Sequence, residues 1–159
     1  MRGDKKVIEI LNDVLTGELT AINQYFLHSE MLANWGYSRL HKKVRKESID
    51  EMLHAETLME RVLYLGGLPN VQRLGPIRIG ENVEEMLRSD LALEEEALPR
   101  LNEGIKHCRA VGDNGTRGLL EDILRSEEEH VDWIEAQLDQ IGQMGLENYL
   151  AAQVRKEEE

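Results

Sequence analysis

Residues 66–80, GGLPNVQRLGPIRIG, decide how this chain folds. Their two leading glycines and the following proline end the helical pattern that precedes them. Fifteen residues span about 50 Å when extended, whereas a helix of about 28 residues is only about 42 Å long. The segment can therefore run the full length of a long helix. The helices before and after it are predicted to be parallel.

Outward from this segment, apolar residues recur at spacings of three and four, as expected for amphipathic helices. Short breaks rich in Gly and Asn separate the other neighbouring helices, which are predicted to be antiparallel. Only three prolines occur, and no alternating β-branched run is present. The prediction is an all-α fold, a four-helix bundle in one domain spanning 1–159. Its long helices are expected at about 5–34, 38–65, 82–110 and 116–142, with a short fifth helix from Glu147 to Val154.

Composition limits the functions that are possible. A net charge of −12 argues against nucleic acid and anionic membranes, which require clustered basic residues. The N-terminus is charged and no apolar run reaches the length of a membrane span, so a soluble, cytoplasmic protein is expected. Cys108 is the only cysteine, which excludes an internal disulfide and agrees with a reducing compartment. Its expected role is a small apolar filler.

Each long helix carries an acidic residue on the face that should be buried. The line from Leu15 to Ile22 in the first helix passes through Glu18. A buried, unpaired carboxylate costs on the order of several kcal/mol, so four of them require counter-charges. Two divalent cations would balance four carboxylates. The same periodicity selects Glu51, Glu94 and Glu127 in the other helices and passes over Glu95, Glu96, Glu128 and Glu129.

Two of these glutamates belong to Glu-x-x-His motifs, Glu51 to His54 and Glu127 to His130. Residues three apart on a helix share one face, so each motif can present both side chains to one metal ion. A single motif of this kind is often a surface ion pair. Two copies, together with inward glutamates on the other two helices, indicate a dinuclear metal site. Oxygen and nitrogen ligands without thiolate favour Fe or Mn, although Zn(II) should compete.

This pattern resembles the di-iron carboxylate proteins of the ferritin-like fold, with one long crossover between helices two and three. Both motifs, the chain length, the crossover and Met52 resemble the bacterioferritin family over essentially the whole chain. The resemblance implies that Glu51 and Glu127 bridge two Fe ions. Glu18 and His54 would complete one iron site, and Glu94 and His130 the other. It also implies oxidation of Fe(II) by O2 or H2O2 and storage of the ferric mineral.

A second apolar line on helix two predicts a subunit interface; its residues are Ile49, Met52, Met59 and Leu63. The resemblance implies a two-fold dimer in which Met52 of each subunit ligates one haem b. A methionine that fills an interface gap is the alternative. The resemblance further implies a hollow homo-oligomer of twenty-four subunits, and an electron-donating ferredoxin that assists iron release.

Several further residues near this site have more than one possible role. Tyr25 lies on the Glu18 stripe, where it could donate a hydrogen bond to a buried carboxylate and supply an electron, or could simply be a satisfied core tyrosine. Glu47 and Asp50 could pass iron to an inner surface, although acids here are more often solvated, and Lys46 replaces the histidine common in the family. The remaining histidines are expected to face solvent or an interface: His28, His41 and His107.

Two other functions remain possible. One is a di-iron peroxidase or oxygenase of the rubrerythrin type, which the single cysteine and the short chain disfavour. The other is a non-catalytic bundle that binds haem or buffers metal. Iron stoichiometry separates these alternatives, because storage takes up many irons per subunit and the others stop near two.

Overall fold

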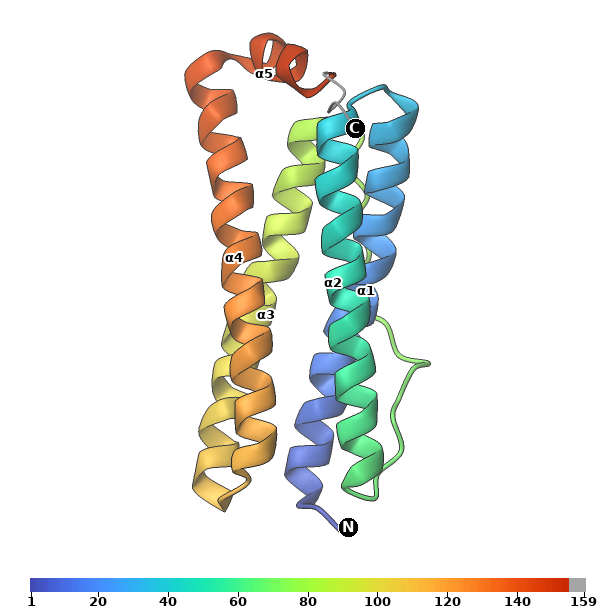
Figure 1. Ribbon diagram of the computed structural model, residues 1–159, viewed down its shortest axis with the longest axis vertical. Helices are drawn as coiled ribbons and strands as arrows, with labels where there is room; N and C mark the ends of the chain where they lie inside the picture. Colours follow the sequence, from blue (N-terminus) through green and yellow to red (C-terminus); the bar gives the residue numbers. More distant parts are fainter. Residues whose placement is uncertain (155–159) are drawn as a thin grey trace.

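The computed structural model describes residues 1–154 and contains five helices and no strand within them (Figure 1). The all-α prediction is confirmed, and helix ends differ from the predicted ones by at most two residues. None of the described helices combines the length and apolar character needed to cross a membrane. The helices are α1 (Lys5–Asn34), α2 (Ser38–Tyr64), α3 (Val83–Val111), α4 (Asn114–Met144) and α5 (Leu146–Gln153).

Local sequence explains where the helices begin and end. The side chains of Asp4 and Asn82 accept hydrogen bonds from backbone amides in the first turns of α1 and α3. Asp113 does the same for Thr116 in α4. These caps satisfy amides that have no partner within the helix. At the end of α3, Gly112 has a φ of 76°, a left-handed conformation that glycine adopts without the steric cost of a Cβ.

The long crossover gives the bundle its topology. α1 pairs with α2, and α3 pairs with α4, each through a short turn (Figure 1). Residues 65–82 then run as an extended strap along the outside of the first pair, from one end of the bundle to the other. α2 and α3 consequently point in the same direction, as predicted.

A ladder of polar side chains on α1 holds this strap. The ladder has one member every fourth residue, which places all of them on a single stripe of the helix. Each accepts a hydrogen bond from the strap at 2.8–3.0 Å, four of them from backbone amides and one from a guanidinium. The pairs are Asn12 with Asn70, Thr16 with Arg73, Thr20 with Gly75, Gln24 with Arg78, and His28 with Gly80.

The expectation that His28 faces solvent or an interface is wrong. Its side chain is fully buried, with Nδ1 at 2.9 Å from Asp90 Oδ1 and Nε2 accepting from the Gly80 amide. A neutral imidazole with its proton on Nδ1 satisfies both contacts. The other two histidines are less buried than His28. His41 is half-buried beside the Ser29 carbonyl, and His107 lies at the surface 3.4 Å from Asp4.

The apolar core is divided into two clusters along the bundle. One surrounds Leu11, Leu58 and Leu120, and the other surrounds Leu40 and Ile134. In every long helix the inward glutamate falls between the residues of the two clusters. Cys108 belongs to the first cluster and is buried, and burial raises the pKa of its thiol to about 11. It is therefore the apolar filler that was expected.

Candidate metal centre

All four long helices contribute to a polar site between the two apolar clusters. Glu18, Glu51, Glu94 and Glu127 are each no more than 3% exposed. The two histidines lie one turn after their glutamates on α2 and α4. The His54 side chain is 16% exposed and that of His130 is 5% exposed. The structure thus brings together the six residues that the sequence indicated.

The six residues form two overlapping groups. Each group supplies four ligand atoms, all within 4.8 Å of one another. One group contains Glu18 and His54, the other contains Glu94 and His130, and Glu51 and Glu127 belong to both. Glu51 and Glu127 are thus shared between the two groups, and they are the two residues that the resemblance implies as bridging ligands.

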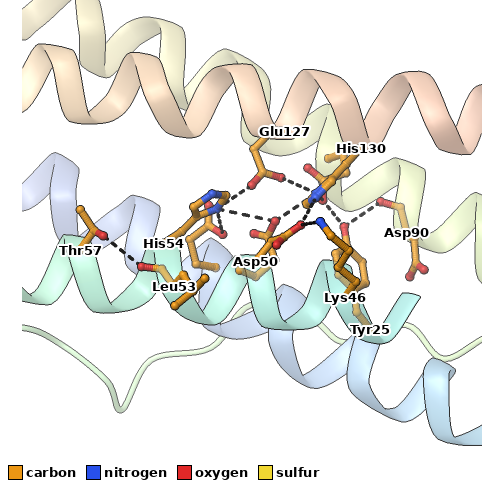
Figure 2. Close-up of polar contacts among 12 residues, drawn as sticks. Tyr25, Lys46, Asp50, Leu53, His54, Thr57, Asp90, Glu127 and His130 are labelled. Carbon is orange, nitrogen blue, oxygen red and sulfur yellow. Dashed lines mark hydrogen bonds and ion pairs between the residues drawn. The ribbon is translucent and has the colours of Figure 1, made fainter. Parts of the chain in front are cut away.

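The histidines lie between the carboxylates (Figure 2). His54 Nδ1 is 3.1 Å from Glu127 Oε1 and 3.5 Å from Glu18 Oε2. His130 Nδ1 is 3.1 Å from Glu51 Oε1 and 3.6 Å from both Glu94 Oε1 and Glu127 Oε2. Both rings therefore present the same nitrogen to the same small volume.

One buried atom of each of the six residues has no hydrogen bond of acceptable geometry within residues 1–154, although both histidine Nδ1 atoms lie within ion-pair distance of carboxylates. Buried polar atoms are nearly always hydrogen-bonded, because desolvation without a partner costs about 1–3 kcal/mol. Six such atoms at one place indicate that a different ligand satisfies them. The atoms are Glu18 Oε2, Glu51 Oε1, His54 Nδ1, Glu94 Oε2, Glu127 Oε1 and His130 Nδ1.

Electrostatics at this site favour the binding of positive charge. Burial, followed by the hydrogen bond and charge of Glu127, raises the pKa of Glu94 to about 8. Burial alone would lower the pKa of His54, but Glu127 and Glu51 outweigh that effect and raise it to about 9. The pKa of His130 is raised well above its ordinary value in the same way. Metal cations would replace these protons and leave the imidazoles neutral.

Tyr25 reaches the site from α1. Its ring is fully buried, and its hydroxyl donates a hydrogen bond to Glu94 Oε1. Burial, together with the charges of Glu94 and Asp90, raises its pKa well above the usual value, so the phenol keeps its proton. The hydrogen bond to a buried carboxylate that the sequence allowed is therefore present.

Asp50 and Glu47, the two acids about one turn before the site on α2, differ in their burial. Asp50 is partly exposed and lies 3.4 Å from His130 Nε2 and 3.3 Å from Lys46 Nζ (Figure 2). Glu47 is 1% exposed, and neither of its carboxylate oxygens has a hydrogen-bond partner among the described residues. Burial raises its pKa to about 8, against the opposing charges of His130 and Lys43. The expectation that acids here are solvated is wrong for Glu47.

A second polar layer beside Tyr25 was missed from the sequence. Asp90 lies one turn before Glu94 on α3 and is buried. Its Oδ1 accepts from Gln24 Nε2 at 2.8 Å and lies 2.9 Å from His28 Nδ1. Burial raises its pKa, although His28 and Gln24 oppose this. The four-residue spacing from Gln24 to His28 and from Asp90 to Glu94 was the signal that could have revealed this layer.

Met52 faces away from the metal-binding side of α2. It is 52% exposed and borders an apolar groove between α1 and the crossover. Met52 shares this groove with Ile22, Asn23, Phe26, Leu27, Glu30, Ile77 and Ile79.

Comparison with known proteins agrees with this architecture. Residues 8–144 match the family described as ferritin-like domain. The chain is 51% identical to a bacterioferritin of Mycobacterium leprae over 151 residues, which cover 95% of each chain. It is 48% identical to a bacterioferritin of Streptomyces coelicolor, covering 98% of this chain and 93% of the relative. A bacterioferritin of Brucella melitensis is 46% identical, with 94% and 92% covered. With four inward glutamates, two inward histidines and one long crossover, this chain belongs to the bacterioferritins, within the ferritin-like family.

Proposed function

We propose that this protein oxidises Fe(II) at the six-residue site and stores the ferric product. Glu18, Glu51, His54 and Glu127 bind one Fe(II), and Glu51, Glu94, Glu127 and His130 bind the other. Four carboxylates balance two divalent ions, so the loaded site is electrically neutral. Oxygen ligands also favour Fe(III) over Fe(II), which assists oxidation.

The observation that carries the proposal is the set of six buried atoms without hydrogen-bond partners, one from each residue. A catalytic site that used only proton transfer would need one or two such groups. Six convergent ligand atoms in two overlapping groups of four fit a pair of metal ions instead.

Oxidation requires an electron acceptor from solution. Each Fe(II) gives up one electron, so a pair reduces O2 with two protons to H2O2, or reduces H2O2 with two protons to two waters. When O2 is reduced beyond H2O2, Tyr25 would give one further electron to the oxidant and become a phenoxyl radical, as its hydroxyl proton passes to Glu94, to which it already donates a hydrogen bond. The buried Glu47 and the partly exposed Asp50 lie on the side from which iron could pass toward storage.

Haem b and oligomerisation complete the proposal. The residues around Met52 fit a haem, because an exposed thioether borders a groove lined mainly by apolar side chains such as Phe26 and Ile77. A second copy of the chain would supply the second methionine, and the haem would carry electrons toward stored iron. The protein is proposed to be a cytoplasmic shell of twenty-four subunits built from such dimers, reduced by a ferredoxin when iron is released.

The test of this function is anaerobic titration with Fe(II), followed by exposure to O2 or H2O2. The wild type is expected to bind two Fe(II) per subunit and oxidise them rapidly. Glu18→Ala removes a ligand that belongs to one metal position only, so the fast phase should slow about tenfold or more. Glu9→Ala, an exposed glutamate on the same helix, is the control and should behave as wild type.

A folded and assembled Glu18→Ala protein that retains the full initial rate would show that the site is wrongly assigned. Uptake that stops at two irons per subunit would favour an enzyme of the rubrerythrin type or a metal buffer. Uptake of many irons would exclude both alternatives.

A further inference from the structure

The metal centre is open toward one side of the bundle through a cavity of about 100 Å³ between α1 and α3. Glu18, Glu51, Glu94 and Glu127 line its inner end. Its outer part is bounded by Gly75 of the crossover. Such a volume holds several water molecules, so small molecules can reach the carboxylates from this side.

Arg100 of α3 lies in the outer part of this cavity. Its guanidinium occupies the space beside the Gly17 Cα, where a Cβ would collide with Arg100 Nη1. The absence of a side chain at position 17 therefore allows the guanidinium to extend from α3 across to α1. No other residue type at position 17 leaves that space open without moving Arg100.

Arg100 carries a positive charge that forms no direct ion pair with the described carboxylates. Within residues 1–154 it has no ion pair, whereas Arg78 pairs with Glu96 at 3.4 Å beside the same cavity. A cation without a direct ion-pair partner in residues 1–154 thus stands between solvent and four carboxylates. A carboxylate-lined cavity would otherwise attract divalent cations along its whole length.

The opposite side of the centre, between α2 and α4, has a different charge pattern. His54 is 16% exposed and Asp50 is 26% exposed there, and Asp50 Oδ2 is 3.4 Å from His130 Nε2. The nearby Lys46 is paired with Asp50 at 3.3 Å. This side therefore offers metal-binding groups at the surface, and the lysines beside them are engaged, Lys46 by Asp50 and Lys43 by the Trp133 ring at 5.4 Å.

We propose that Arg100 is a charge barrier that keeps divalent cations out of the cavity between α1 and α3. That cavity then serves the uncharged oxidant, and Fe(II) exchanges with the centre between α2 and α4, past Asp50 and on the side that leads toward storage. This inference rests on the proposed function, because it assigns separate routes to the two substrates of the same site. Separate routes prevent incoming Fe(II) from obstructing the oxidant.

The experiment measures Co(II) binding by stopped-flow absorbance on the assembled protein at low ionic strength. Co(II) is a probe that occupies the site without being oxidised in the assay. Arg100→Gln should raise the association rate by about three- to tenfold, and Arg100→Glu, of nearly the same shape, by more. The increase in association rate of each variant over wild type should become smaller as salt is added, because ions screen the charge of Arg100. Arg88→Gln on the same helix, an exposed residue paired with Glu84, is the charge-matched control and should match wild type.

Two further measurements separate charge from shape. Arg100→Lys retains the charge and should bind Co(II) at the wild-type rate. Oxidation of pre-bound Fe(II) by H2O2, which is uncharged, should proceed equally in Arg100→Gln and Arg100→Glu.

The outcomes distinguish this inference from the proposed function. If wild type and variants bind two Co(II) per subunit but the Gln and Glu variants associate no faster, the barrier is refuted and the metal site stands. An equal acceleration in Arg100→Lys would also overturn it, because shape rather than charge would control entry. Failure of the wild type to bind two Co(II) would overturn the proposed function itself.

Discussion

Four glutamates of the buried core occupy positions where a bundle would ordinarily carry Leu or Ile. Burial distinguishes neighbouring glutamates here: Glu94 is buried, whereas Glu95 and Glu96 beside it are exposed. A shift of one residue turns a helical side chain by about 100°, so periodicity alone separates a buried carboxylate from a solvated one. Single residues therefore define the candidate site.

Glu47 provides a prediction at this scale. Its carboxyl is buried near Lys43 and His130, which favour its charge, and near Asp90 and Glu94, which oppose it. The folded-state pKa of about 8 exceeds the ordinary value of 4.5. Between these values the folded chain keeps a proton that the unfolded chain releases. The free energy of unfolding of the metal-free protein should therefore fall as pH rises from 4.5 through 8.

Glu47→Gln removes this ionisation while preserving size. At pH 8.5 the metal-free variant should be more stable than wild type by about 1–3 kcal/mol, and at pH 5 the two should be similar. Thermal melts of chelator-treated protein at fixed concentration check this. Glu60→Gln, an exposed position on the same helix, is the control. An equal difference at both pH values would show that Glu47 is not protonated by burial.

At the scale of elements, α1 performs three roles on two faces. One face packs in the core and presents Glu18 and Tyr25 to the site, and the other carries the polar ladder to the crossover. Because the ladder repeats every four residues, it follows the helix axis closely enough to hold an extended segment along its side. The parallel arrangement of α2 and α3 depends on that strap remaining in place.

A substitution at Thr20 tests whether the polar ladder on α1 holds the crossover in place. Its hydroxyl is buried, accepts from the Gly75 amide at 2.8 Å and donates to the Thr16 carbonyl at 2.7 Å. Thr20→Val keeps the shape and removes the acceptor, which should cost about 1–2 kcal/mol and speed hydrogen exchange in residues 66–82.

The control for this prediction is Thr57→Val on α2. The Thr57 hydroxyl is exposed and donates only to the Leu53 carbonyl of its own helix (Figure 2). Its replacement should leave exchange in the crossover unchanged. Equal protection of the crossover in Thr20→Val and wild type would show that the ladder does not hold the strap.

At the scale of the whole molecule, the two proposed iron chemistries lie on different faces of α2, about 100° apart. Glu51 faces the interior, and Met52, the next residue, faces outward over the groove. Haem binding and Fe(II) oxidation should therefore respond independently to substitution. The dimer that shares the haem would form at the outward face.

Met52→Leu tests whether haem binding and Fe(II) oxidation are independent. Volume and apolar character are preserved, so the dimer should lose less than about 1.5 kcal/mol while the thioether is lost. Visible spectra after haem reconstitution should show no bis-thioether haem, and the initial rate of Fe(II) oxidation should be unchanged. Met86→Leu, on α3 and buried in the core, should retain the haem spectrum. A wild-type haem spectrum in Met52→Leu would exclude this residue as the ligand.

The sequence by itself determined the helices, the order of parallel and antiparallel neighbours, and which four glutamates and two histidines face inward. These follow from periodicity, turn residues and loop length, which are properties of short stretches of chain. The assignment of the six residues as iron ligands stays a prediction, supported by their convergence. Tyr25 near a carboxylate could also be anticipated, because it shares the stripe of Glu18.

Only the tertiary structure decided which distant groups meet. His28 was expected outside and lies in the core, because its partners, Asp90 and the Gly80 amide, are 62 and 52 residues away along the chain. Burial of Glu47 and the placement of Arg100 against Gly17 likewise depend on how neighbouring helices pack. Helical periodicity specifies the direction of a side chain but not what it faces. The hydrogen bonds and unpaired charges of this site are therefore set by the distances between helices.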